Sequence, residues 1–236
     1  QKIEKVLNFF DAQKDLAKDT TNVNFYKSKY DKFVWPAKKL ALADRVGVEQ
    51  RKVDQAHVII NFPGLENNHP DRFALSILLN ILGAGMSSRL FVEVREKRGL
   101  AYMIKTNASS FRDNRLCYVQ AGLDPASLGV AIKVIKNEIE KIGNEPVTKE
   151  ELRDAQDNIS GRTALSMEDS SAQAEWFAKQ FLFASSIKTP DQFLTKLKQV
   201  NIKQVQKVAQ KLLKWDEMRL AIISPYDKEK VLGMIR

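Results

Sequence analysis

The stretch that decides the fold is QAHVIINF, residues 55–62. Its apolar side is formed by Ala56, Val58, Ile60 and Phe62, and its other side by Gln55, His57, Ile59 and Asn61. Successive side chains of a strand point to opposite faces, so this period of two predicts a half-buried β-strand. Pro63 and Gly64 end the strand. The sequence therefore predicts a sheet with one face packed against a core.

Downstream of this strand, the pattern predicts helices and a β-hairpin. A helix is expected from Pro70 to Leu82, because its apolar side chains recur at helical spacing, and the glycine-rich segment 83–85 ends it. A short helix is expected at Ser88–Lys97. The next two strands, Tyr102–Phe111 and Leu116–Leu123, are expected to form a hairpin around a polar turn.

The rest of the chain is predominantly helical. Apolar residues between Leu128 and Ile142 form one helical stripe. Thr148 followed by Glu151 is a capping box, which opens a helical stretch to about Ile187 with expected interruptions at Gly161 and at residues 168–171. The last expected elements are two helices around Phe193–Leu197 and Ile202–Leu212, a strand at Met218–Ser224 and a helix at Lys228–Ile235.

This order of elements predicts the fold class and the division of the chain. Strands that include a hairpin, followed by a run of helices, favour an α+β fold: a mostly antiparallel sheet with helices packed on one face. Residues 1–54 are expected to be a lead-in helix and linker from an upstream domain, because Trp35-Pro36 blocks helix continuation within a lysine-rich stretch. The folded domain is then residues 55–236, starting near Gln55.

Length and composition exclude several classes of protein. With 236 residues, 44% of them hydrophobic and 28% charged, the chain can bury a real core. The longest uncharged run, Phe73–Ser88, is shorter than the about 20 apolar residues of a membrane-spanning helix, so we expect a soluble protein without a membrane span. The single cysteine, Cys117, excludes an intrachain disulfide and a cysteine-rich zinc site. The bacterial periplasm and the cytoplasm both fit, and Gln1 does not distinguish a processing site from a cut in a longer chain.

The formal net charge is +9, and part of it is concentrated in one run. Lys188–Lys214 carries seven lysines against one acid, Asp191, which gives +6. Such a run is more often a solvated helix face than a binding surface. Few aromatic residues are interleaved with these lysines, which argues against a stacking platform for bases. We therefore expect no nucleic-acid partner.

The inventory of catalytic side chains is thin. His57 and His69 are the only histidines, and their spacing forms no HxxEH or HxxxH zinc pair. His57 lies on the polar side of its strand, and His69 precedes a proline where a helix cap belongs. Cys117 falls within an expected strand, so a buried, inert thiol is the favoured interpretation. The sequence predicts neither a metal site nor a cofactor site in this chain.

Residues 83–102, GAGMSSRLFVEVREKRGLAY, form a long and specific motif. It resembles the signature of the C-terminal, non-zinc domain of the insulinase, pitrilysin and mitochondrial processing peptidase family of zinc metallopeptidases. The upstream strand with Phe62-Pro63-Gly64 is similar to the start of that domain, and the resemblance extends to about Pro225. Ala84 is a departure, since many relatives have a third glycine there.

The resemblance implies a division of labour. Enzymes of this family consist of two similar α+β halves that close over a peptide, and the N-terminal half carries HxxEH, the zinc and the catalytic glutamate. The C-terminal half contributes an arginine and a tyrosine, which correspond here to Arg95 and Tyr102. Arg95 is implied to hydrogen-bond the substrate backbone, and Tyr102 to donate to the oxyanion. The implied partners are an HxxEH-bearing half, in the same polypeptide or a separate subunit, and a peptide substrate; zinc is expected in that partner half.

The chemistry of Arg95 and Tyr102 suits these two roles, but both residues also have a purely structural interpretation. A guanidinium offers five donors for carbonyl oxygens, and a phenol beside developing negative charge is an oxyanion donor. Composition alone favours a core tyrosine and a surface arginine paired with Glu93 or Glu96, and the surrounding motif favours the functional roles. We further expect one face of the sheet to be largely uncovered, with Arg95 and Tyr102 at its rim.

Two functions from different classes remain open at this point. The first is the substrate-binding, non-zinc half of a peptidase, which is inactive as an isolated chain. The second is a catalytically inert scaffold subunit of the same fold, as in the core proteins of respiratory complexes. Retention of Arg95 and Tyr102 favours the first, and an HxxEH sequence preceding Gln1 would decide between them.

Overall fold

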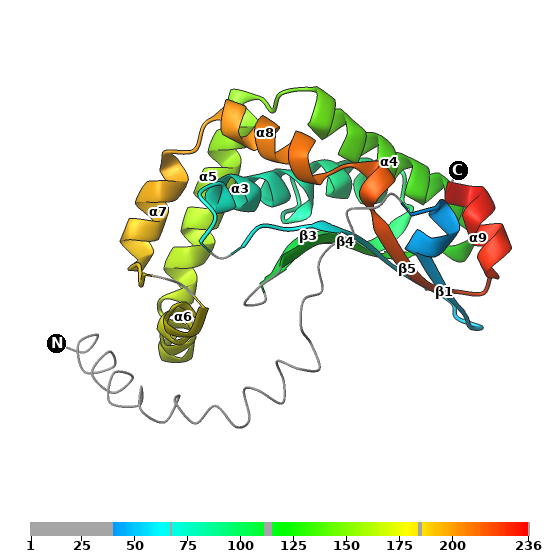
Figure 1. The fold of residues 1–236 in the computed structure, drawn as a ribbon, viewed down its shortest axis with the longest axis horizontal. Coiled ribbons are helices and arrows are strands. Elements are labelled where there is room, and N and C mark those ends of the chain that lie inside the picture. Colours follow the sequence, from blue (N-terminus) through cyan, green and yellow to red (C-terminus); the bar gives the residue numbers. More distant parts are fainter. Residues whose placement is uncertain (1–39, 67, 111–114, 184–185, 236) are drawn as a thin grey trace.

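The structure, a computed structural model, describes residues 40–66, 68–110, 115–183 and 186–235. Strands and helices lie in the order expected for an α+β domain (Figure 1). The strands are β1 (Val46–Gln50), β2 (Ala56–Pro63), β3 (Ala101–Ser110), β4 (Arg115–Leu123) and β5 (Arg219–Ser224). The α-helices are α3 (Arg72–Gly83), α4 (Leu128–Asn144), α5 (Lys149–Ser166), α6 (Ser170–Phe183), α7 (Pro190–Lys198), α8 (Ile202–Leu212) and α9 (Lys228–Ile235). Single turns of other helix types are η2 (Leu42–Arg45), η3 (Phe91–Glu96), η4 (Pro125–Ser127) and η5 (Trp215–Glu217).

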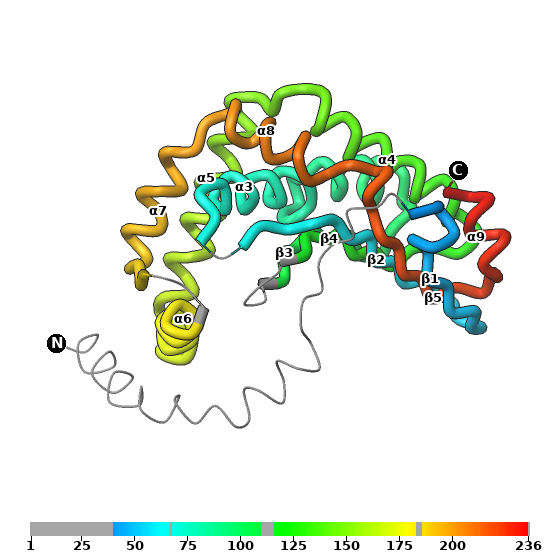
Figure 2. The backbone as a smooth tube through the Cα atoms, in the orientation of Figure 1, coloured from blue at the N-terminus to red at the C-terminus, as the bar shows by residue number. Residues whose placement is uncertain are grey.

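The described strands form one mixed sheet in the order β1-β5-β2-β4-β3. The pairs β5–β2, β2–β4 and β4–β3 are antiparallel, and only β1 pairs with its neighbour in parallel. The last strand of the chain thus lies between the first two, as the backbone trace in Figure 2 shows. The predicted α+β class with a mostly antiparallel sheet is confirmed.

One face of the sheet is packed against the helices. On β2, Val58, Ile60 and Phe62 are almost completely buried. Helices α3, α4 and α8 lie on this side of the sheet in Figure 1, and their apolar stripes complete the core. The period of two in residues 55–62 therefore predicts the buried face correctly.

The opposite face carries exposed or half-exposed side chains. Residues on this face align across the sheet, because the pairing register is continuous from strand to strand. One such row contains Lys105, Gln120, Ile59, Ala221 and Gly47. A neighbouring row contains Asn107, Tyr118, Asn61 and Arg219. Both rows mix polar side chains with a few apolar ones, so the expected open face is confirmed for the described residues.

The helix signals in the sequence have mixed outcomes. The capping box at Thr148 and Glu151 is present at the start of α5, with both reciprocal hydrogen bonds formed. The break expected at residues 168–171 separates α5 from α6. Gly161, in contrast, does not interrupt α5, because an exposed glycine lowers helix stability without removing any hydrogen bond. No helix in the described ranges is long and apolar enough to cross a membrane.

The sheet begins earlier than the expected domain start near Gln55. Residues 46–50 were expected in the lead-in, yet they form β1, which pairs in register with β5. The only described partner of β1 is β5, near the other end of the chain. The residues around β1 therefore carry no sequence pattern that predicts this strand. Residues 1–39, where the lead-in helix was expected, lie outside the described residues, so the lead-in from an upstream domain stays a prediction.

Candidate functional site

The motif residues 91–102 form a turn that joins η3 to β3. The expected short helix is present as Phe91–Glu96. One of its hydrogen bonds, from the Lys97 amide to the Val92 carbonyl at 2.9 Å, joins residues five apart instead of the usual four. Val94 is fully buried and anchors the turn to the core. Gly99 has a φ of 61°, a left-handed conformation that favours glycine. The chain therefore reverses after η3 and enters β3 at once.

Tyr102 is the second residue of β3 and lies at a β-bulge. Ala101 pairs with Leu123 and Met103 pairs with Gly122, so Tyr102 is the extra residue on its strand. A bulge of this kind redirects a side chain, and bulges are enriched beside active sites. The Tyr102 side chain is 78% exposed. The alternative that Tyr102 is a core residue is therefore wrong.

Arg95 is exposed at the end of η3, and the only described interaction of its side chain is with an aromatic ring. The guanidinium carbon lies 5.0 Å from the centroid of the Phe91 ring. The surface pairing of Arg95 with Glu93 or Glu96 is absent from the described residues, and Glu93 binds Lys97 and Arg98 instead, each at 2.6 Å. Hydrogen bonds from these two cations lower the pKa of the Glu93 carboxyl, which stays ionised in the turn.

Arg89, earlier in the same motif, has a structural role. Its guanidinium donates two hydrogen bonds to the Glu151 carboxylate, from Nε at 2.6 Å and from Nη2 at 3.0 Å. Burial raises the pKa of Glu151, but the bonds from Arg89 and Thr148 outweigh it, so the net pKa is lowered. The side chains of Arg89 and Glu151 are only 14% and 28% exposed. This ion pair ties the motif to the first turn of α5.

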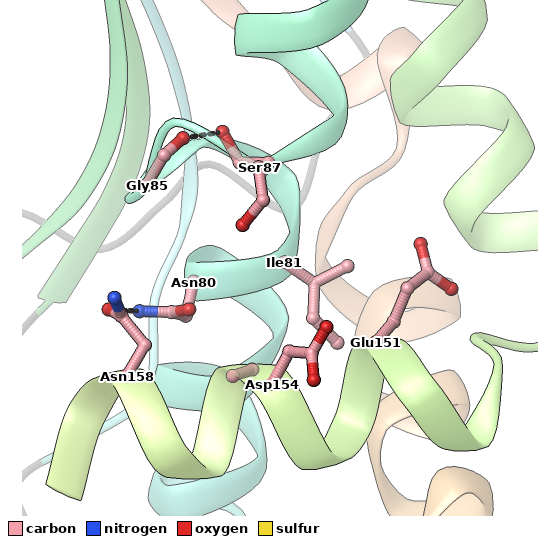
Figure 3. Close-up of a pocket in the computed structure, with 9 residues that line it drawn as sticks. Asn80, Ile81, Gly85, Ser87, Glu151, Asp154 and Asn158 are labelled. Atoms are coloured by element: carbon pink, nitrogen blue, oxygen red, sulfur yellow. Dashed lines mark hydrogen bonds between the residues drawn. The ribbon is translucent and has the colours of Figure 1, made fainter. Parts of the chain in front are cut away.

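A small polar pocket of about 60 Å³ lies beside this contact, between α3 and α5 (Figure 3). Asn80 donates a hydrogen bond of 3.0 Å to Asn158 across it, and the Ser88 hydroxyl donates to the Gly85 carbonyl at 2.5 Å. A second pocket of about 420 Å³ lies on the other side of Arg89, between η3, α4 and the start of α5. Neither of these two pockets is lined by Arg95 or Tyr102. Both of those side chains are exposed, so the candidate site is a surface site.

The remaining candidates have ordinary structural environments. His57 is exposed on β2, and the Nδ1 atom of His69 accepts a hydrogen bond from the Asp71 amide at the start of α3. Cys117 is buried, its thiol donates to the Pro63 carbonyl at 3.2 Å, and burial raises its pKa to about 12. Across the described ranges, no three His, Cys, Asp or Glu side chains are grouped so that they could hold a metal ion.

Sequence reasoning identified Arg95 and Tyr102 through the motif, and the structure places them at the two ends of one turn, on elements that contact each other. It missed the ring contact of Phe91, the Arg89–Glu151 ion pair and the bulge. The four-residue spacing of Phe91 and Arg95 within a short helix was the one available signal, because side chains at that spacing are neighbours.

Comparison with known proteins identifies the family and the fold of this chain. A family model described as the peptidase M16 inactive domain matches residues 4–159. An uncharacterized zinc protease of Streptomyces coelicolor is 37% identical over 171 residues, which are 72% of this chain and 37% of that protein. The crystal structure of a peptidase M16 inactive domain from Pseudomonas fluorescens superimposes with a TM-score of 0.69 at 22% identity, covering 77% of this chain and 44% of that one.

A chain of complex III from Candida albicans has the same fold, with a TM-score of 0.68 at 13% identity, covering 80% of this chain and 48% of that chain. This chain thus spans less than half the length of each of these proteins. The family model nevertheless matches more than half of the chain, and the motif, the fold and the zinc-protease relative agree with it. The chain belongs to the peptidase M16 family and matches the inactive, C-terminal domain of that family.

Proposed function

We propose that this chain is the substrate-binding, non-zinc half of a zinc metallopeptidase. In this role it encloses a peptide together with a partner half that carries HxxEH and the zinc, in the same polypeptide or in a separate subunit. The observation that carries the proposal is the exposed Tyr102 at a bulge, one turn away from an exposed Arg95. Neither side chain contributes to the core, so a role outside the isolated domain accounts for both.

The two side chains supply different chemistry. Arg95 donates hydrogen bonds to carbonyl oxygens of the peptide backbone, which fixes the substrate without selecting its sequence. Tyr102 donates a hydrogen bond from its phenol O–H to the oxygen that becomes negative when the scissile carbonyl is attacked. The open face of the sheet offers a polar wall beside these groups. The metal-activated water belongs to the partner half, and no step on this chain depends on a metal.

The test uses the complete peptidase, with both halves present, and compares Tyr102→Phe with wild type. Loss of one oxyanion donor costs about 2.7–4 kcal/mol, a factor of roughly 10²–10³ in kcat. The ring is kept and Tyr102 is exposed, so the melting temperature should not change. Tyr226→Phe, in the loop before α9, is the matched control and should retain wild-type kcat. A Tyr102→Phe enzyme with wild-type kcat would refute the assigned role.

The alternative is a catalytically inert scaffold, and the fold shared with a complex III chain is the observation that favours it. The two proposals differ in the behaviour of the assembled protein. A peptidase half makes the zinc-loaded assembly hydrolyse peptides, whereas this chain alone should bind no stoichiometric zinc and show no chelator-sensitive activity. A zinc-loaded assembly that cleaves no peptide from a broad library would favour the scaffold.

A further inference from the structure

Three cations, Arg95 at the end of η3 and Lys97 and Arg98 just after it, have different interaction partners. Lys97 and Arg98 both bind the Glu93 carboxylate at 2.6 Å, and Arg98 also donates to the Glu93 backbone carbonyl at 2.6 Å. Arg95 has no ion pair with any described residue, and its guanidinium lies over the ring of Phe91. Within this turn, one carboxylate thus holds two cations and one ring holds the third.

A ring holds a guanidinium in a way that suits substrate binding. A cation within about 6 Å of an aromatic centroid is attracted by the ring quadrupole. A bidentate carboxylate would instead occupy two N–H donors and compete with any substrate carbonyl. A carboxylate or carbonyl acceptor occupies one or more of the five guanidinium N–H donors, whereas contact with an aromatic ring leaves all five free. The Phe91 contact therefore restrains Arg95 and leaves its donors available.

The ring lies on a helical turn that is anchored in the core. Phe91 is half-buried, and the flanking Leu90 and Val94 are fully buried. Phe91 and Arg95 lie four residues apart in η3, so the ring and the guanidinium share one side of the turn. The Arg95 guanidinium thus lies over a half-buried ring on a turn that Leu90 and Val94 anchor in the core.

We propose that Phe91 is a positioning residue: its ring holds the Arg95 guanidinium in the orientation that binds the substrate backbone. Glu93 assists by keeping Lys97 and Arg98 away from the same carbonyl oxygens. This inference rests on the proposed function of Arg95, and it adds residues that act through Arg95 without touching the substrate.

The test compares Phe91→Leu and Phe91→Tyr in the complete peptidase. Leucine keeps apolar bulk but removes the π-face, so KM should rise about two- to fivefold, the worth of an exposed cation–π contact, while kcat stays the same. Tyrosine keeps the face and should restore the wild-type KM. In an Arg95→Ala background, Phe91→Leu should change KM no further, because the ring then has no guanidinium to hold.

Two outcomes would overturn the proposal while leaving the proposed function intact. One is an equal rise in KM from Phe91→Leu with and without Arg95, which would make the ring merely structural. The other is an unchanged KM in Phe91→Leu although Arg95→Ala impairs the enzyme. If Arg95→Ala leaves both KM and kcat unchanged, the proposed function of Arg95 fails, and the positioning role fails with it.

A second measurement detects the contact itself without relying on activity. In the complete peptidase with labelled arginine, the Arg95 side-chain protons should show a ring-current shift in the NMR spectrum. This shift should persist in Phe91→Tyr and disappear in Phe91→Leu. A wild-type spectrum without it would show that the contact does not form, and would overturn the proposal.

Discussion

The two faces of the sheet differ although they share the same strands. Ile60 and Ile59 are neighbours on β2, yet Ile60 is fully buried and Ile59 is 37% exposed. On the inner face, packing against the helices requires apolar side chains. On the open face, packing imposes little, so polar groups such as Lys105 and Asn107 are tolerated there. The difference teaches that the pleat of a strand separates, one residue apart, the side chains that pack the core from those that packing leaves free.

The largest expected difference in stability is between two variants that each truncate one isoleucine, one on each face of the sheet. Ile60→Ala removes fully buried methyl groups and leaves a cavity, which should lower the free energy of unfolding by about 2–5 kcal/mol. Ile59→Ala, the matched variant one residue away, should lower it by no more than about 1 kcal/mol. Urea unfolding monitored by circular dichroism measures both. Similar losses for the two variants would break the distinction between the faces.

A second prediction tests how tightly the helices cover the inner face. A Cβ atom at Gly83 would lie 2.6 Å from the methyl group of Thr106. The Thr106 side chain is held in place because its hydroxyl donates a hydrogen bond to the Leu79 carbonyl at 2.6 Å. Gly83→Ala should therefore destabilise by about 1–3 kcal/mol, although alanine is the better helix former.

Thr106→Ser is the matching rescue for that variant. It removes the methyl group and keeps the hydroxyl, so adding it to Gly83→Ala should recover part of the loss in thermal unfolding. The Thr106 backbone nitrogen, 3.0 Å from the added Cβ atom, remains in the double variant, so the recovery should be partial. No recovery would mean that the clash with the Thr106 methyl group does not cause the loss.

A third prediction concerns the polar contact that ties the motif to the helix layer. The pKa of Glu151 is lowered in the folded state, so its contribution to stability is present above its unfolded pKa, about 4.3, and is lost as the pH falls through the folded value. Glu151→Gln should lower the free energy of unfolding at pH 7 by about 1–2 kcal/mol. The difference from wild type should shrink below pH 4, and a difference independent of pH would contradict the role of the charge.

The smallest expected effect is on the open face. Lys105→Ala and Asn107→Ala remove exposed side chains of β3, so each should change the free energy of unfolding by less than about 0.5 kcal/mol. Urea midpoints at pH 7 are sufficient to measure this. A loss above 1 kcal/mol from either variant would show that the open face contributes to stability in the isolated domain.

The parts of the fold that the sequence predicted are those with local periodicity. The alternation in residues 55–62 predicted β2 and its buried side, and the stripe from Leu128 predicted α4. The capping box at Thr148 predicted the start of α5. In each case the signal lies within a few residues, where backbone geometry and side-chain chemistry act together.

The parts that the sequence did not predict depend on distant residues. β1 is a five-residue strand that contains a glycine, and only the presence of β5 makes it part of the sheet. The bulge at Tyr102 arises from the register between β3 and β4, which no single strand encodes. The wide hydrogen-bond spacing in η3 is likewise absent from the pattern of Phe91–Glu96. The motif located the candidate residues, and tertiary structure decided how they are presented.

The position of β5 has a consequence for the order in which the protein folds. β5 lies between β1 and β2, although about 160 residues separate it from β2 along the chain. Pairings this distant close slowly, because a long loop must be ordered before they form. On the ribosome, β2 must wait with one open edge until residues 219–224 have been synthesised, while β3 and β4 can already pair. An open strand edge is a site of misassembly, so a chaperone is expected to be most useful during this interval.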